Sequence, residues 1–299
     1  MSAAISLAGV SRRFRDQQAL SEVTFDIATP SIVGLLGRNG AGKSTLLRIL
    51  AGQEKATSGR VSVLGAAPLE NDAVLRRMVL IREDQTYPDL KVRQVLAAAA
   101  MFYPNWDAGL AASLLEAYEL PAARAVKKLS RGMRAAVGII IGLAARADVT
   151  LFDEPVAGLD AVVRDMFYAQ LLADYTAHPR CIVLSTHLID EAADLLERVL
   201  IIDHGRLVLD ALTDDVRGTA ATVTGPTSSV ERFIADRAIL SRRTLGAQTT
   251  AVMAGRLDDR DRELAGQLRL DLSYLTLQQL AMQASGGTAR ADLAPMGAS

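Results

Sequence analysis

The eight-residue stretch GRNGAGKS, from Gly37 to Ser44, places the strongest constraint on how this chain can fold. The apolar run SIVGLLG leads into it and is typical of a short strand, and KSTLLRILAG follows it with the pattern of a helix. Glycines allow the backbone amides of such a turn to point inward at an anion, and the start of the helix adds partial positive charge. The stretch therefore predicts a strand–loop–helix unit that holds the phosphates of a nucleotide.

The side chains of this loop have separate expected tasks. We expect Lys43 to reach the β- and γ-phosphates, Ser44 to ligate Mg²⁺ and Thr45 to hold the α-phosphate side. A chance glycine-rich turn is the alternative, and the flanking strand and helix disfavour it. The expected nucleotide-binding residues of this segment are Gly37, Arg38, Asn39, Gly40, Ala41, Gly42, Lys43, Ser44 and Thr45.

Two adjacent acids, Asp153 and Glu154, close the apolar run VTLF near the middle of the chain. Neighbouring residues of a strand point to opposite faces, but at its end both side chains can turn toward one site. We expect Asp153 to hold Mg²⁺ through water and Glu154 to be the base that polarises the attacking water. An acidic turn followed by Pro155 is the alternative, and the phosphate loop upstream favours the catalytic interpretation.

Strands and helices alternate through the first two thirds of the 299 residues, which predicts an α/β fold with a largely parallel, covered sheet. A mostly helical subdomain is expected at about 85–130. We expect the nucleotide-binding domain to span residues 1–215 and a small α+β region to span 216–284. The end of the chain, 285–299, is small and polar and is expected to be disordered.

The net charge and the lengths of the apolar runs argue against a nucleic-acid-binding protein and against a chain that spans a membrane. A net charge of −1 and a pI of about 6.3 supply no global positive field, so nucleic acid is not an expected partner. The most apolar run, residues 135–147, is shorter than the roughly 20 residues of a membrane span and is expected to be a buried helix. A single cysteine, Cys181, excludes an intrachain disulfide and fits a reducing cytosol. The first residues lack the basic-then-apolar order of a signal peptide.

The segment LSRGM, residues 129–133, opens the long apolar helix that precedes the acid pair. With the phosphate loop before it and the acids after it, the chain resembles the ATP-binding-cassette (ABC) ATPases over about residues 4–215. The resemblance implies a cassette with an antiparallel N-terminal β part, a mostly parallel sheet and a helical subdomain. It also implies that two cassettes meet head to tail, so that Ser130 and the amide of Gly132 contact the γ-phosphate held by the partner. Without the family pattern, Ser130 would be interpreted as an ordinary helix cap.

Three further positions match the family. Phe14 matches the aromatic residue that stacks on adenine, His187 the histidine that contacts the γ-phosphate, and Asp160 the loop that crosses the dimer interface. The alternatives are a core phenylalanine, a structural histidine and a helix cap. The signature departs from the usual LSGGQ, because Arg131 replaces its first glycine and Met133 its glutamine. We expect Arg131 either to add positive charge near phosphate or to face solvent.

The family also expects a glutamine after the strand MVLI, in the loop that links ATP to the membrane partner. In this sequence Glu83 aligns with that position and Gln85 follows two residues later. An acid near Mg²⁺ can ligate it directly or through water, so Glu83 is a candidate for the metal site. Gln85 stays a second candidate, because a different register of the loop would bring it to the family position.

The resemblance implies an ATP-hydrolysing subunit that uses ATP and Mg²⁺ and powers a separate transmembrane permease through ATP-driven dimerisation. It implies a cytoplasmic protein held at the inner face of the membrane, with a second identical cassette as the default partner. The chain is similar to a bacterial branch often encoded with GntR-type regulators, in which export is the expected direction. The alternative is a soluble ABC ATPase acting on nucleic acid or ribosomes. A small-molecule kinase is disfavoured, because it would not need the signature segment or His187.

Overall fold

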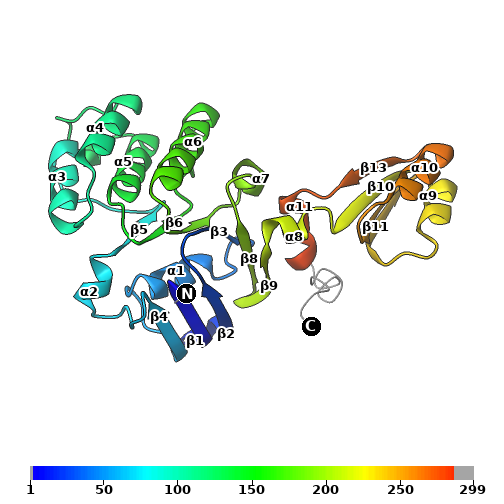
Figure 1. Cartoon of the computed structure of the whole chain (residues 1–299), viewed down its shortest axis with the longest axis horizontal. Coiled ribbons are helices and arrows are strands. Elements are labelled where there is room, and N and C mark those ends of the chain that lie inside the picture. The colour runs from blue at the N-terminus through cyan, green and yellow to red at the C-terminus, as the bar shows by residue number, and fades with distance from the viewer. Residues whose placement is uncertain (1–2, 286–299) are drawn as a thin grey trace.

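The computed structural model describes residues 3–285, and a six-stranded sheet lies at its centre (Figure 1). Five strands run parallel in the order β5, β6, β7, β3 and β8, and β9 closes one edge antiparallel to β8. Strands β6 and β7 are buried along their whole length, which confirms the predicted parallel, covered sheet. The strands of this sheet are β3 (Ser31–Leu36), β5 (Met78–Arg82), β6 (Val149–Asp153), β7 (Cys181–Ser185), β8 (Arg198–Asp203) and β9 (Arg206–Leu212).

Strand β3 alternates its side chains between two apolar cores, one on each face of the sheet. Val33 and Leu35 belong to the core that includes α1 (Lys43–Leu50), and Ile32 and Leu36 belong to the core on the opposite face. An antiparallel sheet of order β2, β1, β4 contributes to the α1 core, so the helix after the phosphate loop is held by both sheets. The strands of this small sheet are β1 (Ile5–Phe14), β2 (Gln17–Ile27) and β4 (Ser58–Val63).

Helices gather on the other face of the large sheet, at the upper left of Figure 1. A break at residues 104–107 separates two of them, and the Asp107 carboxylate caps the second by accepting the Leu110 N–H at 2.8 Å. The helices on this face are α3 (Val92–Phe102), α4 (Ala108–Ala117), the 3₁₀ turn η1 (Val126–Lys128), α5 (Arg131–Ala144), α6 (Ala161–Ala177) and α7 (Ile189–Ala192). The short helix α2 (Asp72–Leu75) instead packs on the α1 core through Val74.

Helix α5 lies close against β5 and β6 because glycines line the contact. A Cβ atom on Gly138 would lie 2.9 Å from Cγ2 of Ile81, and one on Gly142 would lie 2.5 Å from Cε1 of Phe152. The most apolar run of the sequence forms this helix, which is buried from Ala136 to its end. Within residues 3–285, no helix combines the length and the apolar character that a membrane crossing requires.

A third sheet follows the cassette-like part and projects from it at the right of Figure 1. Its element order is βαββαβ and its strand order is β11, β12, β10, β13, all antiparallel, which is the ferredoxin-like arrangement. Two helices bury Val230, Phe233 and Ala265 in its own core. The elements are β10 (Ala220–Pro226), α9 (Thr227–Ile234), β11 (Ile239–Leu245), β12 (Gln248–Ala254), α10 (Asp259–Leu268) and β13 (Asp271–Tyr274).

The chain then returns to the larger part through α11 (Leu277–Ser285), after having left it through α8 (Thr213–Val216). Helix α11 packs on β8, β9 and α7, and its Leu277 and Leu280 belong to the core that covers the large sheet. The Asp190 carboxylate of α7 accepts the Gln278 N–H at 3.1 Å. The α+β region is therefore held at both ends. The disordered tail expected at 285–299 falls, after Ser285, outside the described residues.

The close contact at Gly142 leads to a stability prediction. Replacing Gly142 with alanine is expected to lower the local stability by about 1–3 kcal/mol, because the new methyl group would overlap the Phe152 ring. Gly266, in α10, is the matched control: a Cβ there meets nothing within 4 Å, so Gly266→Ala is expected to stabilise by about 0.5–1 kcal/mol. Hydrogen exchange of the core amides around each site measures both changes. A stabilising Gly142→Ala would contradict the packing argument.

Candidate active site

The loop between β3 and α1 needs its glycines for steric reasons. Gly37, Gly40 and Gly42 all have positive φ angles, of 147°, 78° and 113°. A Cβ atom on Gly37 would lie 2.2 Å from the Ile202 carbonyl oxygen, and one on Gly42 would lie 2.7 Å from that of Ala19. Helix α1 begins after Gly42 with no side-chain cap and no acid in its first turn. The loop therefore presents backbone N–H groups and the positive end of a helix to one place.

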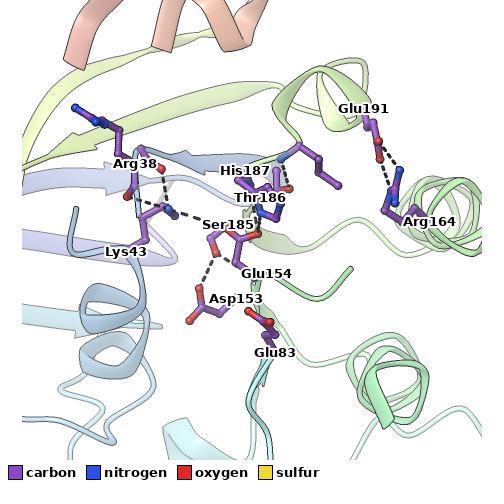
Figure 2. A network of polar contacts seen from close by, with 12 residues as sticks. Arg38, Lys43, Glu83, Asp153, Glu154, Arg164, Ser185, Thr186, His187 and Glu191 are labelled. Atoms are coloured by element: carbon purple, nitrogen blue, oxygen red, sulfur yellow. Dashed lines mark hydrogen bonds and ion pairs between the residues drawn. The ribbon is translucent and has the colours of Figure 1, made fainter. Parts of the chain in front are cut away.

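Lys43 is 6% exposed, and its ammonium group lies inside the curve of this loop (Figure 2). It donates to the carbonyl oxygens of Gly37 at 2.7 Å and Arg38 at 3.3 Å, and Nζ lies 3.9 Å from Oε1 of Glu154. Burial lowers the Lys43 pKa, and the nearby carboxylates of Glu154 and Asp153 oppose that shift. The positive charge is thus placed in a poorly solvated position where an anion gains most from it.

The two acids at the end of β6 are held by one hydroxyl group from the neighbouring strand. Ser185, the last residue of β7, donates its hydroxyl to Oδ1 of Asp153 at 2.7 Å and accepts the Glu154 N–H at 3.2 Å. The parallel pairing places Asp153 opposite Ser185 in register. Ser185 was not predicted from the sequence. The signal that could have identified it is its position as the polar residue that ends the apolar run CIVL.

Glu154 lies just beyond the strand with a φ angle of 52°, a conformation that non-glycine residues rarely adopt. This turn brings Glu154 to the same side as Asp153, as the sequence predicts for acids at a strand end. Its Oε2 lies 2.7 Å from Nδ1 of His187 and accepts the His187 N–H at 3.2 Å. Its Oε1 is buried and accepts no hydrogen bond from any side chain or backbone group of residues 3–285. That oxygen therefore keeps its capacity to accept a hydrogen bond from a bound molecule.

The two candidates after β5 lie in different environments. The Glu83 N–H donates to the Asp153 carbonyl at 3.0 Å, which fixes Glu83 beside the acid pair. The Glu83 side chain lines one cavity with Lys43 and Glu154 and a second with Ser44 and Asp153. Gln85 turns back on its own strand, because its Oε1 accepts the Arg82 N–H at 3.2 Å.

The cavity around the phosphate loop has a volume of about 450 Å³, within the range of nucleotide-sized pockets. Phe14, at the end of β1, forms part of its wall, and the Arg12 guanidinium lies 4.3 Å from the centre of the Phe14 ring. Its lining is Phe14, Gln17, Ala19, Asn39, Gly40, Ala41, Gly42, Lys43, Ser44, Thr45, Glu83 and Glu154.

The signature residues are not part of this lining. Ser130 caps α5, since its hydroxyl accepts the Met133 N–H at 3.2 Å, and Asp160 caps α6 by accepting the Val163 N–H at 3.0 Å. A Cβ atom on Gly132 would lie 3.3 Å from Cδ2 of Leu159, so the start of α5 packs on the loop before α6. The structure brings Ser130, Gly132 and Asp160 together at two helix starts, away from the chain's own phosphate loop.

Comparison with known proteins agrees with this geometry. Residues 20–157 match the family model described as "ABC transporter". The chain is 26% identical over 216 residues to ABC transporter ATP-binding protein YtrB of Bacillus subtilis, covering 71% of this chain and 74% of that protein. It is 31% identical over 210 residues to Nod factor export ATP-binding protein I of Rhizobium sp. strain N33, covering 68% and 69%. The chain belongs to the ABC transporter family.

Two further comparisons extend this result for the ABC chain. It is 35% identical over 211 residues to the aliphatic sulfonates import ATP-binding protein SsuB of Burkholderia ambifaria, and spans 63% of that relative's length and 69% of its own. A solved structure described as the ATP-binding subunit of an ABC transporter superposes with a TM-score of 0.65 at 25% identity, over 71% of this chain and 91% of that one. The fold predicted from the sequence, a P-loop ABC cassette of the ATPase class, is thereby confirmed.

The shared hydroxyl of Ser185 gives the prediction for this site. Ser185→Ala is expected to lower the free energy of unfolding by about 1–3 kcal/mol and to slow ATP turnover, because the Asp153 carboxylate loses a buried hydrogen-bond donor. The Glu154 N–H keeps the Ser185 carbonyl as its acceptor at 3.1 Å. Ser113→Ala is the control, since that exposed hydroxyl only donates to the Leu110 carbonyl of its own helix, and a change within about 0.5 kcal/mol is expected. Urea unfolding and phosphate release measure the two effects. Equal behaviour of the two variants would contradict a role for Ser185 in holding the acids.

Proposed function

We propose that this ABC cassette binds ATP at the Gly37–Thr45 loop and hydrolyses it with Glu154 as general base. This proposal rests on the buried Lys43 and on Glu154, which line one cavity, and on the His187 ring, whose Nδ1 lies 2.7 Å from Oε2 of Glu154. Phe14, which lines the same cavity, is proposed to stack on the adenine. Residues 1–215 are proposed as the nucleotide-binding domain and 216–284 as an accessory region.

In the proposed reaction, a water held by Oε1 of Glu154 attacks the γ-phosphorus, and the bond to the β–γ bridging oxygen breaks to give ADP and phosphate. Glu154 accepts the proton of that water. Lys43 and the N–H groups of the loop stabilise the negative charge on the transferred group. His187, which contacts Oε2 of Glu154, orients the base and reaches toward the γ-phosphate.

The donors around Ser44 fit a magnesium ion. Ser44, Asp153, Glu83 and Glu154 line a cavity of about 270 Å³, and hydroxyl and carboxylate oxygens are the ligands this cation takes. Arg48 and Arg82 also line it, but they pair with Glu54 and Asp84. Residues 3–285 contain no group of three His, Cys, Asp or Glu side chains placed to hold a metal alone. These residues therefore fit a magnesium ion whose ligands would come partly from the protein and partly from the nucleotide phosphates. The ion would neutralise phosphate charge when bound.

We propose that a second cassette completes the site, with the partner's Ser130, Gly132 and Asp160 segments facing the nucleotide. Their position outside the chain's own nucleotide cavity supports this arrangement. The start of α5 would direct the positive end of its helix dipole at the partner's γ-phosphate. A homodimer is proposed, because one chain carries both the phosphate loop and the signature.

Two substitutions test this dimer. Glu154→Gln preserves the shape of the base and removes its proton acceptor, so we expect hydrolysis to fall by roughly 10²–10⁴-fold and an ATP-dependent dimer to accumulate. Adding Ser130→Arg to it should leave ATP binding intact and abolish the dimer, because the new side chain would occupy the partner's phosphate position. Light scattering after gel filtration measures the dimer, and nucleotide filter binding measures ATP. A dimer that survives Ser130→Arg would refute the arrangement.

We further propose that the dimer drives a separate transmembrane subunit in export, from a peripheral position on the inner face of the membrane. Family membership and the absence of a membrane-length helix within residues 3–285 support a separate membrane partner. The relatives include an import protein and an export protein by name, so the identity of the membrane partner decides the direction. Tyr87, Pro88 and Tyr103 of the helical subdomain are proposed groove residues for it.

Purification from the native cell tests the transporter assignment. Tagged Glu154→Gln protein, extracted gently from membranes with ATP and Mg²⁺, should retain a polytopic membrane protein at stoichiometric yield, identified by mass spectrometry. Lys43→Ala, which should bind nucleotide poorly, is the matched control and should retain less. Recovery of ribosomal proteins or nucleic acid without a membrane subunit would instead support the soluble ABC ATPase.

A further inference from the structure

Glu83 borders both the nucleotide cavity and a neighbouring cleft. On one side it lines the cavities of the phosphate loop and of Ser44. On the other side it lines a cleft of about 480 Å³ bounded by Arg131 and Tyr87. Its backbone is fixed to β6 through the Asp153 carbonyl, so the side chain can turn between the two spaces without moving the strand.

Within the cleft, Glu83 forms an ion pair with Arg131, the first residue of α5. Arg131 also lies across the loop before α6, because a Cβ atom on Gly158 would lie 3.2 Å from its Nε. Of the other charged residues lining the cleft, Arg82 pairs with Asp84 and Lys127 with Asp89. The Arg134 guanidinium donates to the Leu129 carbonyl at 3.2 Å. Arg131, a residue of the signature segment, therefore contacts both the loop before Asp160 and Glu83, which lies beside the proposed metal ligands.

The two members of the pair occupy two of the three positions where the sequence departs from the family pattern, and Met133 is the third. An acid stands where the family has glutamine, and an arginine stands where it has the first glycine of the signature. The glutamine and glycine of the family pattern are both uncharged. In this chain, Glu83 and Arg131 carry opposite charges and form an ion pair. Arg131 thus supplies the positive charge that pairs with the negative charge of Glu83.

The pair is weak enough to be exchanged. The Arg131 side chain is 62% exposed and that of Glu83 38%, and ion pairs between such solvent-exposed groups contribute little to stability. A divalent cation beside the phosphates attracts a carboxylate more strongly than an exposed guanidinium does, because it carries twice the charge and binds the oxygen directly. A guanidinium held against that carboxylate in turn repels the cation.

We propose that Glu83 alternates between Arg131 and the nucleotide-bound metal, so that metal–nucleotide binding releases the signature arginine. Arg131 is a positioning residue for Glu83 in the free cassette, and its release leaves the guanidinium available to the phosphates of the partner site. This inference rests on the proposed function, because it requires a nucleotide and a divalent cation at the phosphate loop.

Manganese binding tests the exchange without using turnover. Mn²⁺ is titrated into the full-length, ADP-loaded protein, and free Mn²⁺ is read from its electron paramagnetic resonance signal, with monomers verified by light scattering. Arg131→Ala is expected to tighten Mn²⁺ binding about 3–10-fold, because Glu83 loses its competitor. Lys127→Ala is the matched control: it removes a cation from the same cleft that pairs with Asp89, and a change below about 2-fold is expected.

The double variant separates exchange from general electrostatics. Glu83→Gln should weaken Mn²⁺ binding, and adding Arg131→Ala to it should then change the affinity less than about 2-fold. An unchanged affinity in Arg131→Ala, or the same tightening with and without Glu83, would overturn the proposal. Wild-type protein that binds neither ADP nor Mn²⁺–ADP would instead refute the proposed function, so the two failures are distinguishable.

Discussion

The site depends on the register of three adjacent parallel strands. Leu35 of β3 and Asp153 of β6 both pair with Ser185 of β7, so the ends of the three strands lie side by side. The phosphate loop leaves the first strand, the acids end the second and His187 follows the third. A shift of one residue in any pairing would move a side chain to the opposite face of the sheet. The short distances among Lys43, Glu154 and Ser185 follow from this register rather than from any single side chain.

The sequence was sufficient to predict the phosphate loop, the acid pair and the parallel sheet, because each rests on local spacing and apolar pattern. It was insufficient at Glu83 and Gln85, which are both plausible ligands by position. The Glu83 N–H bond to Asp153 is a contact across 70 residues that only the folded sheet creates. The same limit applies to the ferredoxin-like order of residues 220–274, since a short α+β run does not reveal which strands pair.

The C-terminal α+β region contacts the larger part of the chain close to His187. Helix α7 has four residues and begins two residues after His187. Its Asp190 accepts the Gln278 N–H of α11, and its Glu191 forms a bidentate pair with Arg164 of α6 at 2.8 and 2.9 Å (Figure 2). These contacts connect the segment that follows His187 to α6 and to α11.

The Glu83–Arg131 ion pair can be exchanged because it contributes little to stability. A buried ion pair would hold the signature helix rigidly and would resist exchange, because separating it would leave an uncompensated charge without water. An exposed pair loses little when its carboxylate turns away, since water solvates the freed guanidinium. The backbone of Glu83 stays fixed to β6 while the side chain exchanges partners, so the change requires side-chain rotation alone. Such a contact can distinguish two nucleotide states without adding appreciably to the stability of either one.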